Sequence, residues 1–178
     1  MITDDEDLAR AASLGDGAAF AALLERHYDR LYRLCFRLTG ARAEAEDLAQ
    51  DICERLPAKL RGWRGEAKVT TWLWRVAVNA AHDRRRRRAS YLKASDGWGD
   101  WEAARREAIA EGRERAGWLL EAMGRLPPDL RDTLALVLDE VSHAEAGAIL
   151  GVSEGTVSWR VSEAKKRLRA IRAAEEAR

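Results

Sequence analysis

Residues 151–161 read Gly151-Val152-Ser153-Glu154-Gly155-Thr156-Val157-Ser158-Trp159-Arg160-Val161, and they predict the corner and second helix of a helix-turn-helix. Just upstream, Ser142 and Glu145 have the spacing of a capping box, which starts a short helix. Gly151 is suited to end that helix, because glycine adopts a left-handed backbone conformation without strain. Ser153 is then the natural N-cap of the next helix.

That next helix has two unlike faces. Val157, Val161, Ala164, Leu168 and Ile171 recur every three or four residues, so one stripe packs inward. The opposite face is polar and largely cationic. A helix of this kind fits the major groove of DNA, whereas the alternative is an ordinary helical hairpin with a solvated basic face.

Length and composition limit the class of protein. The chain has 178 residues, 47% of them apolar, which suits one medium domain or two small ones. An acidic start and the lack of a long apolar run predict a soluble, cytoplasmic protein without membrane insertion. Cys35 and Cys53 lack metal-type spacing and are expected to be reduced, buried thiols. We expect no metal, cofactor, small-molecule substrate or catalytic residues.

The formal net charge of +1 hides alternating blocks of charge. Residues 1–60 have 8 basic and 12 acidic side chains, and residues 61–93 have 10 and 2. Residues 94–150 have 6 and 12, and residues 151–178 have 7 and 4. Two separate cationic blocks suggest two nucleic-acid contacts on one chain, and the acidic blocks suggest contacts with protein.

The acidic first block contains two predicted helices. The first spans residues 17–38, and His27 lies on its apolar stripe, so we expect a packed, hydrogen-bonded histidine at the edge of the core. The second spans about 43–56. Its polar face projects within roughly 100° of arc and consists of Asp47, Gln50, Asp51 and Glu54. Such a face is either simply solvated or docks a basic partner.

The basic second block begins in a predicted loop over residues 57–68. An exposed Trp63 beside Arg64 suits stacking on an unpaired base. A third helix starts near Val69, and we expect Trp72 and Trp74 to pack in its core. Its polar face has Arg75, Asn79, His82 and Arg86 at spacings of four, three and four, and the run from Arg84 to Arg88 extends the positive charge toward phosphates.

Together these segments resemble the extracytoplasmic-function (ECF) sigma factors, small two-domain bacterial transcription initiation factors. The resemblance covers nearly the whole chain, and its strength lies in the order and spacing of the motifs. The matching segments are Gly15-Asp16 with Phe20 to Leu24, Asp47-Leu48-Ala49-Gln50-Asp51, Trp63-Arg64-Gly65, the run Thr71-Trp72-Leu73-Trp74-Arg75-Val76-Ala77-Val78-Asn79, Leu126-Pro127, and Leu150-Gly151-Val152 with Gly155-Thr156-Val157.

The resemblance implies an all-α fold of two small helical domains. Residues 8–90 would bind core RNA polymerase and the minus-ten promoter element, residues 91–117 would be a linker, and residues 118–174 would read the minus-thirty-five element. Core polymerase would contact Asp47, Gln50, Asp51 and Glu54. The minus-ten element would contact Trp63, Arg64, Lys68, Arg75, Asn79, His82, Arg84, Arg85, Arg86, Arg87 and Arg88. The minus-thirty-five element would contact Ser153, Glu154, Thr156, Ser158, Trp159, Arg160, Lys165 and Lys166.

The sequence departs from the family pattern in the second domain. Ala146 and Gly147 stand where larger residues are usual, which is expected to weaken packing of the first helix of the helix-turn-helix. Glu163 is expected to repel a nearby phosphate. Trp159 either fills the space beside Ala146 and Gly147 or contacts a thymine methyl or sugar.

The implied function is an alternative sigma factor, without catalytic activity, that directs core polymerase to promoters and is held by an anti-sigma factor. One alternative is a sigma-like decoy that binds an anti-sigma factor without using DNA, and another is a free-standing helix-turn-helix repressor. The opposite charges of residues 61–93 and 94–150 further predict that the free chain is compact, with Trp98 or Trp101 of the linker buried between the domains.

Overall fold

The computed structural model describes residues 4–94 and 115–177, which form helices and turns without a strand. The all-α prediction is therefore confirmed for the described residues. The helices are α1 (Asp5–Ser13), α2 (Gly17–Thr39), α3 (Arg42–Leu60), α4 (Val69–Ala94), α6 (Arg115–Gly124), α7 (Pro128–Leu138), α8 (His143–Leu150) and α9 (Glu154–Glu176).

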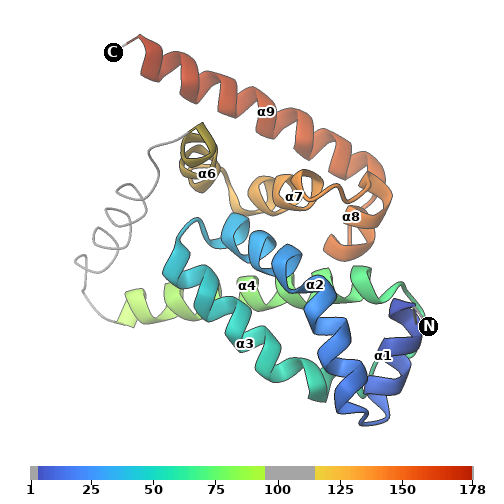
Figure 1. Cartoon of the computed structure of the whole chain (residues 1–178). Helices are drawn as coiled ribbons and strands as arrows, with labels where there is room; N and C mark the ends of the chain where they lie inside the picture. Colours follow the sequence, from blue (N-terminus) through green and yellow to red (C-terminus); the bar gives the residue numbers. More distant parts are fainter. Residues whose placement is uncertain (1–3, 95–114, 178) are drawn as a thin grey trace.

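Helices α1 to α4 form the first group, the N-terminal unit, in which α2, α3 and α4 enclose an apolar core (Figure 1). Leu31, Leu34 and Leu48 are almost fully buried there. His27 is buried and its Nε2 lies 2.8 Å from Asp5 Oδ2, which confirms the expected hydrogen-bonded histidine at the core edge. Trp74 is buried and Trp72 packs against the same core, also as predicted.

The predicted end of α3 is wrong by about one turn. Pro57 lies inside the helix, which continues to Leu60, so the loop begins only at residue 61. Proline removes one backbone N–H and normally disrupts a helix interior. Here Leu56 and Leu60 are both buried, so tertiary packing holds the last turn in helical form.

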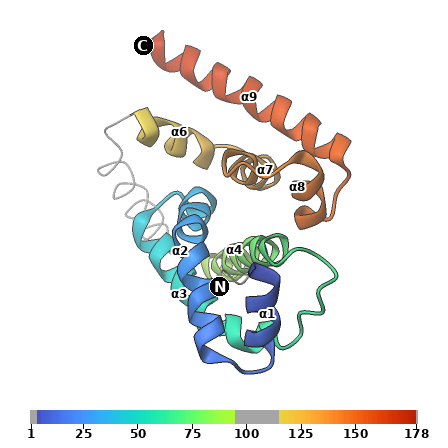
Figure 2. The same cartoon turned by 45° about the vertical axis from the view of Figure 1, so that its right-hand side comes forward.

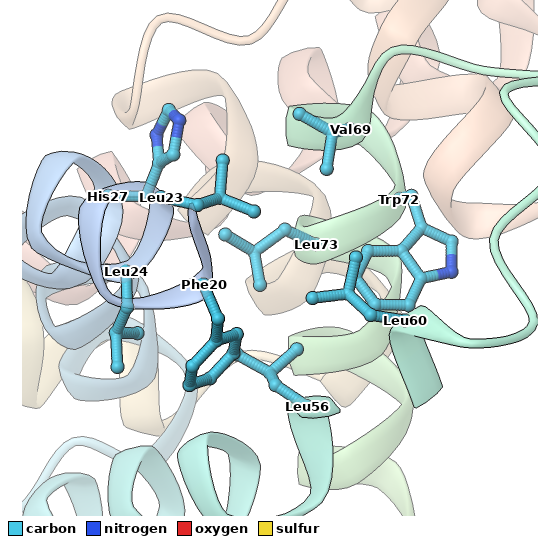
Figure 3. Close-up of a pocket in the computed structure, with 9 residues that line it drawn as sticks. All are labelled: Phe20, Leu23, Leu24, His27, Leu56, Leu60, Val69, Trp72 and Leu73. Atoms are coloured by element: carbon cyan, nitrogen blue, oxygen red, sulfur yellow. The ribbon is translucent and has the colours of Figure 1, made fainter. Parts of the chain in front are cut away.

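A small hollow lies between α2, α3 and α4, as Figure 3 shows. Its volume of about 10 Å³ has room for roughly one water molecule. The lining is apolar except for His27, whose Nε2 is already bonded to Asp5. We therefore regard the hollow as imperfect core packing and not as a substrate site.

Helices α6 to α9 form the second group, the C-terminal unit. The long α9 lies along α7 and α8, and Val157, Val161, Ala164 and Leu168 are buried as the periodicity predicts. Helix α6 starts at Arg115, so helical structure begins inside the predicted linker of residues 91–117. Helix α7 ends at Leu138 and belongs to the acidic block of residues 94–150.

The two units pack against each other (Figures 1 and 2). Helix α7 contacts α2, and α8 contacts α4, so the apolar core continues from one unit into the other. Acidic side chains of α7 face basic side chains of α4, as the opposite charge blocks predict. The acidic Asp139, just after α7, also faces basic side chains of α2, which that prediction did not include. Trp98 and Trp101 lie outside the described residues.

Candidate nucleic-acid interface

The helix-turn-helix begins with the predicted capping box. Ser142 Oγ accepts a hydrogen bond of 3.2 Å from the backbone N–H of Glu145, and Glu145 Oε2 accepts one of 3.4 Å from the N–H of Ser142. Gly151 ends α8 with a φ of 70°, and Ser153 caps α9 by accepting from the N–H of Thr156 at 3.1 Å. These local contacts fix the corner between α8 and α9.

Gly147 is a structural requirement of this corner and not a weakness. A Cβ atom at this position would lie 2.7 Å from the carbonyl oxygen of Val152, which is closer than real Cβ contacts allow. The N–H of Val152 also donates to the carbonyl of Gly147 at 3.0 Å. Ala146 is fully buried. The expectation that Gly147 weakens the packing of α8 is therefore wrong, because the corner needs backbone to approach backbone at that position.

Trp159 is exposed over 61% of its surface, so the structure excludes the packing alternative for this side chain. Glu154, Ser158, Lys165 and Lys166 are exposed on α9 as well. The outer face of α9 is thus a half-turn-wide polar surface with one large aromatic side chain on it.

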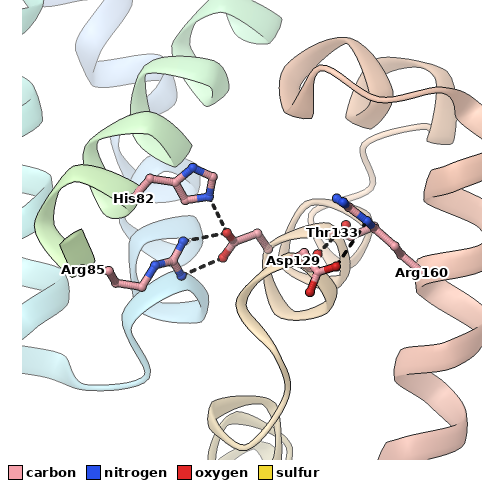
Figure 4. A network of polar contacts seen from close by, with 6 residues as sticks. His82, Arg85, Asp129, Thr133 and Arg160 are labelled. Carbon is pink, nitrogen blue, oxygen red and sulfur yellow. Dashed lines mark hydrogen bonds and ion pairs between the residues drawn. The ribbon is translucent and has the colours of Figure 1, made fainter. Parts of the chain in front are cut away.

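Several polar groups of α9 already have partners within the C-terminal unit. Arg160 is only 18% exposed in its side chain and lies 3.7 Å from Asp129 of α7. Figure 4 shows the two side chains pointing toward each other between α9 and α7. Ser158 Oγ lies 2.9 Å from His143 Nδ1. Glu163 accepts a hydrogen bond of 2.8 Å from Arg167, and this bond lowers the pKa of Glu163. The positive charge of Arg167 offsets the repulsion of phosphate expected from Glu163.

The acidic face of α3 is present and largely exposed. Asp47, Gln50 and Glu54 are exposed, and Asp51 is half-buried. Gln50 donates to Glu54 at 3.1 Å. Arg84 of α4 donates to Asp47 at 3.2 Å and to Asp51 at 3.4 Å, so one guanidinium partly neutralises this face.

The arginine run is divided among different surfaces, because consecutive helix residues point about 100° apart. Arg84 and Arg88 turn toward α3, where Arg88 pairs with Glu44. Arg85 turns toward α7 of the C-terminal unit. Arg86 and Arg87 are exposed, and Arg86 pairs with Asp83 one turn away. The run is therefore not one continuous phosphate-binding surface in this arrangement.

The loop between α3 and α4 differs from its prediction at the tryptophan. Trp63 is half-buried against the small apolar cluster of α1 and α2, whereas Arg64 is exposed. The indole N–H of Trp63 is buried and has no hydrogen-bond partner among the described residues. The apolar indole is drawn inward because the buried Leu60 and Val69 at the two ends of the loop provide a surface for it.

Four other residues predicted to contact the minus-ten element touch the C-terminal unit. Lys68 Nζ lies 3.8 Å from Glu145, and Arg75 donates to the carbonyl of Ala148 at 2.8 Å. His82 and Arg85 both bond to a carboxylate of α7, toward which they point in Figure 4. Asn79, on the same face of α4, is exposed.

Sequence reasoning missed two carboxylates of the C-terminal unit: Asp132 of α7, which meets His82 and Arg85, and Asp139 just after α7, which meets two arginines of α2. Asp132 and Asp139 are both buried. They stand seven residues apart, which places them on one face of a helix that is otherwise mostly apolar. Two acidic residues at that spacing on an otherwise apolar helix are the sequence pattern from which a buried ion-pair interface could have been predicted.

Within the described residues, no helix is long and apolar enough to cross a membrane, and no group of three or more histidine, cysteine or acidic side chains is placed to hold a metal ion. The features present are an acidic helix face, a helix rich in arginine and a helix-turn-helix. Together these features are typical of helical DNA-binding proteins.

Comparison with known proteins agrees with this class. The family model for sigma-70 region 2 matches residues 23–91, and the model for sigma-70 region 4 matches residues 116–168. The ECF RNA polymerase sigma factor SigM of Mycobacterium tuberculosis is 36% identical over 170 residues, which cover 92% of this chain and 82% of SigM. SigW of Bacillus subtilis is 30% identical over 167 residues, covering 87% of this chain and 89% of SigW.

Solved structures show the same fold. The structure of CnrH in complex with the cytosolic domain of CnrY has a TM-score of 0.71 at 24% identity, and the match covers 96% of this chain and 97% of that one. The sigma factor RpoE in complex with the anti-sigma factor NepR, from Bartonella quintana, also has a TM-score of 0.71 at 24% identity, with 85% and 94% covered. The chain belongs to the ECF sigma factors of the sigma-70 family and is an alternative sigma factor of transcription initiation.

Proposed function

We propose that this protein binds core RNA polymerase through the acidic face of α3 and brings it to promoters in the cytoplasm. The N-terminal unit would contact and help to open the minus-ten element, and α9 would read the minus-thirty-five element. The chain would contribute no catalytic group, since the polymerase performs the reaction. The relatives named as RNA polymerase sigma factors support this assignment.

One observation of the structure carries most weight for DNA reading. The corner of the helix-turn-helix is closed by a capping box, by Gly151 and by the close approach at Gly147, while the outer face of α9 stays polar and exposed. A helix fixed in this way, with Trp159, Lys165 and Lys166 outward, has the geometry to enter a major groove.

The residue roles follow from position. Trp159 would contact sugar or thymine methyl groups, and Lys165 and Lys166 would contact phosphates, together with Ser153, Glu154, Thr156, Ser158 and Arg160 around them. In the N-terminal unit Arg64, Lys68, Asn79, Arg86 and Arg87 are exposed in the closed arrangement. Arg75, Arg85 and the bonded ring nitrogen of His82 would become available on separation from the C-terminal unit.

The test is reconstitution with core polymerase, followed by transcription from a library of genomic promoters. We expect transcripts that start downstream of a shared pair of sequence elements and that are absent without this protein. Start sites identical to those of core polymerase alone would reject the proposed function.

A sigma-like decoy is the second candidate, and the closed arrangement favours it, because residues proposed for the minus-ten element contact the C-terminal unit. Both solved relatives described above are complexes with a second protein, and RpoE is in complex with an anti-sigma factor. A decoy would bind such a partner yet give no promoter-specific transcript in the reconstitution. An anti-sigma factor is also the regulatory partner that we propose for a functional sigma factor.

A further inference from the structure

The polar part of the interface between the two units is built around two buried carboxylates, one in α7 and one just after its end. Asp132 is 1% exposed, and Arg85 donates to both of its oxygens, at 2.9 and 2.6 Å. His82 Nε2 lies 2.6 Å from Oδ2 of the same group. Burial by itself raises the pKa of Asp132, but the hydrogen bonds from His82 and Arg85 outweigh burial and hold the pKa below its usual value.

Asp139, one residue beyond the end of α7, repeats this arrangement against α2. Its side chain is 5% exposed and accepts from Arg30 at 3.1 Å and from Arg37 at 3.2 Å. Arg30 also donates to the backbone carbonyl of Asp139 at 3.1 Å. Leu136, which is fully buried, lies between the two acids on the same stripe of the helix. One face of α7 is therefore clamped between α2 and α4.

A second line of contact runs along α8. Lys68 reaches Glu145, and Arg75 donates to the carbonyl of Ala148. In total, four cationic or basic side chains from the N-terminal unit that are proposed to contact promoter DNA instead contact α7 or α8. Each of them meets an anionic oxygen or a carbonyl oxygen, the same kind of acceptor that a phosphate offers.

We propose that Asp132 and Asp139 form an internal latch that keeps the free protein closed, in which the carboxylate of Asp132 occupies the position of a promoter phosphate against His82 and Arg85 and Asp139 ties α7 to α2. This inference rests on the proposed function, because His82 and Arg85 matter to the latch as DNA-binding groups. Carboxylate and phosphate both bind guanidinium through paired N–H···O bonds, so one site cannot hold both. The latch must open before Arg75, His82 and Arg85 can complete the minus-ten surface.

The chemistry of the interface makes such opening feasible. Ion pairs at a buried interface gain Coulomb energy but lose hydration, so their net contribution to closure is modest, and the apolar core that continues between the units contributes the rest. The lost contacts are replaced when a polyanion or polymerase binds the exposed surfaces. The closed and open arrangements then differ by an amount that a binding partner can supply.

The experiment compares three forms of the full-length chain. The latch variant is Asp132→Asn with Asp139→Asn, which keeps side-chain shape and removes two buried charges. The matched control is Glu121→Gln with Glu176→Gln, which makes the same change in net charge. Both acids are exposed, and each pairs inside the C-terminal unit: Glu121 with Arg125, just after α6, and Glu176 with Arg172 in α9.

Two properties of each form are measured at physiological salt. Small-angle scattering gives the radius of gyration, and fluorescence anisotropy gives the affinity for a labelled random single-stranded DNA of about 20 nucleotides. We expect the wild type and the control to be compact, and the latch variant to be expanded. If about one tenth of the wild-type molecules are open, the latch variant binds this DNA about tenfold more tightly than the control.

Circular dichroism checks that helix content is unchanged. If the latch variant loses helix, wild-type protein is instead measured from about 0.15 M to about 0.5 M salt, where the screening length shortens. Expansion at constant helix content supports the latch. The latch is overturned if the latch variant is folded and as compact as the control. If the latch variant is unfolded, the latch is overturned when the radius of gyration of the wild type does not change with salt.

The latch and the proposed function fail separately. If the protein gives promoter-specific transcription but does not open in these measurements, the proposed function is supported and the latch is rejected. If the protein opens but gives no promoter-specific transcription, the conformational change is supported and the proposed function is rejected. That result favours the decoy.

Discussion

Helices α4 and α9 are both rich in basic residues, yet the structure makes their charge available to very different degrees. On α4, Arg84 contacts α3, Arg85 contacts α7, and Arg75 contacts α8. On α9, Lys165 and Lys166 remain exposed. The difference arises because α4 lies between acidic helices of both units, whereas one side of α9 faces solvent (Figure 2). The number of arginines in a helix therefore does not measure how strongly it attracts a phosphate.

The largest effect is expected at the α3 surface that α4 partly neutralises. Changing Asp47→Arg and Asp51→Arg should abolish binding to core polymerase, since breaking charged interface pairs typically costs about 2 to 5 kcal/mol. The side chains are 67% and 47% exposed, so the fold should survive. A pull-down with core polymerase measures the result, and Glu46→Arg, an exposed change on the same helix, is the control. Undiminished binding would remove this face from the proposed function.

The next effect concerns the corner that orients α9. Gly147→Ala places a Cβ against the Val152 carbonyl and should lower the free energy of unfolding by about 1 to 3 kcal/mol, as overpacking does. Gly155→Ala is the matched control, because its Cβ would meet only Ser153 Oγ at an ordinary 3.8 Å. Thermal unfolding of both variants measures the difference. Equal melting temperatures would contradict the close approach at Gly147.

The contrast between paired and exposed arginines can be tested within α4 itself. Arg86→Gln with Arg87→Gln should lower the slope of log affinity against log salt by about 2, if each contacts one phosphate. Arg84→Gln with Arg88→Gln should mainly reduce stability, because both side chains face α3. The measurement is DNA binding across a salt series for the two double variants. If the two pairs reduce the salt slope equally, the division of the run among surfaces does not persist in the DNA complex.

The smallest effect is expected for Trp159→Ala. Truncation of an exposed side chain should change the free energy of unfolding by no more than about 0.5 kcal/mol. Affinity for duplex DNA with the minus-thirty-five element should fall by about 1 to 3 kcal/mol, within the range for a base contact. The two measurements are thermal unfolding and anisotropy on that duplex. A lower melting temperature with unchanged affinity would mean that the indole packs after all.

Local sequence determined the helix-turn-helix almost completely. Ser142, Glu145, Gly151 and Ser153 act through hydrogen bonds and backbone conformations within three or four residues, and the structure has each of them as predicted. The apolar stripes of α2 and α9 were likewise predictable, because helical periodicity alone places those residues on one face. The order and spacing of the motifs along the chain were also sufficient to indicate the family.

Contacts between distant segments decided what the sequence did not determine. The continuation of α3 through Pro57, the inward turn of Trp63 and the role of Gly147 all depend on neighbours that are not adjacent in sequence. The arginine run was visible as charge, but its division among α3, α7 and solvent required the positions of Asp47 and Asp132 in space. Coulomb and hydrogen-bond energies depend on distances of a few ångström and on exclusion of water, and only the tertiary structure sets these quantities.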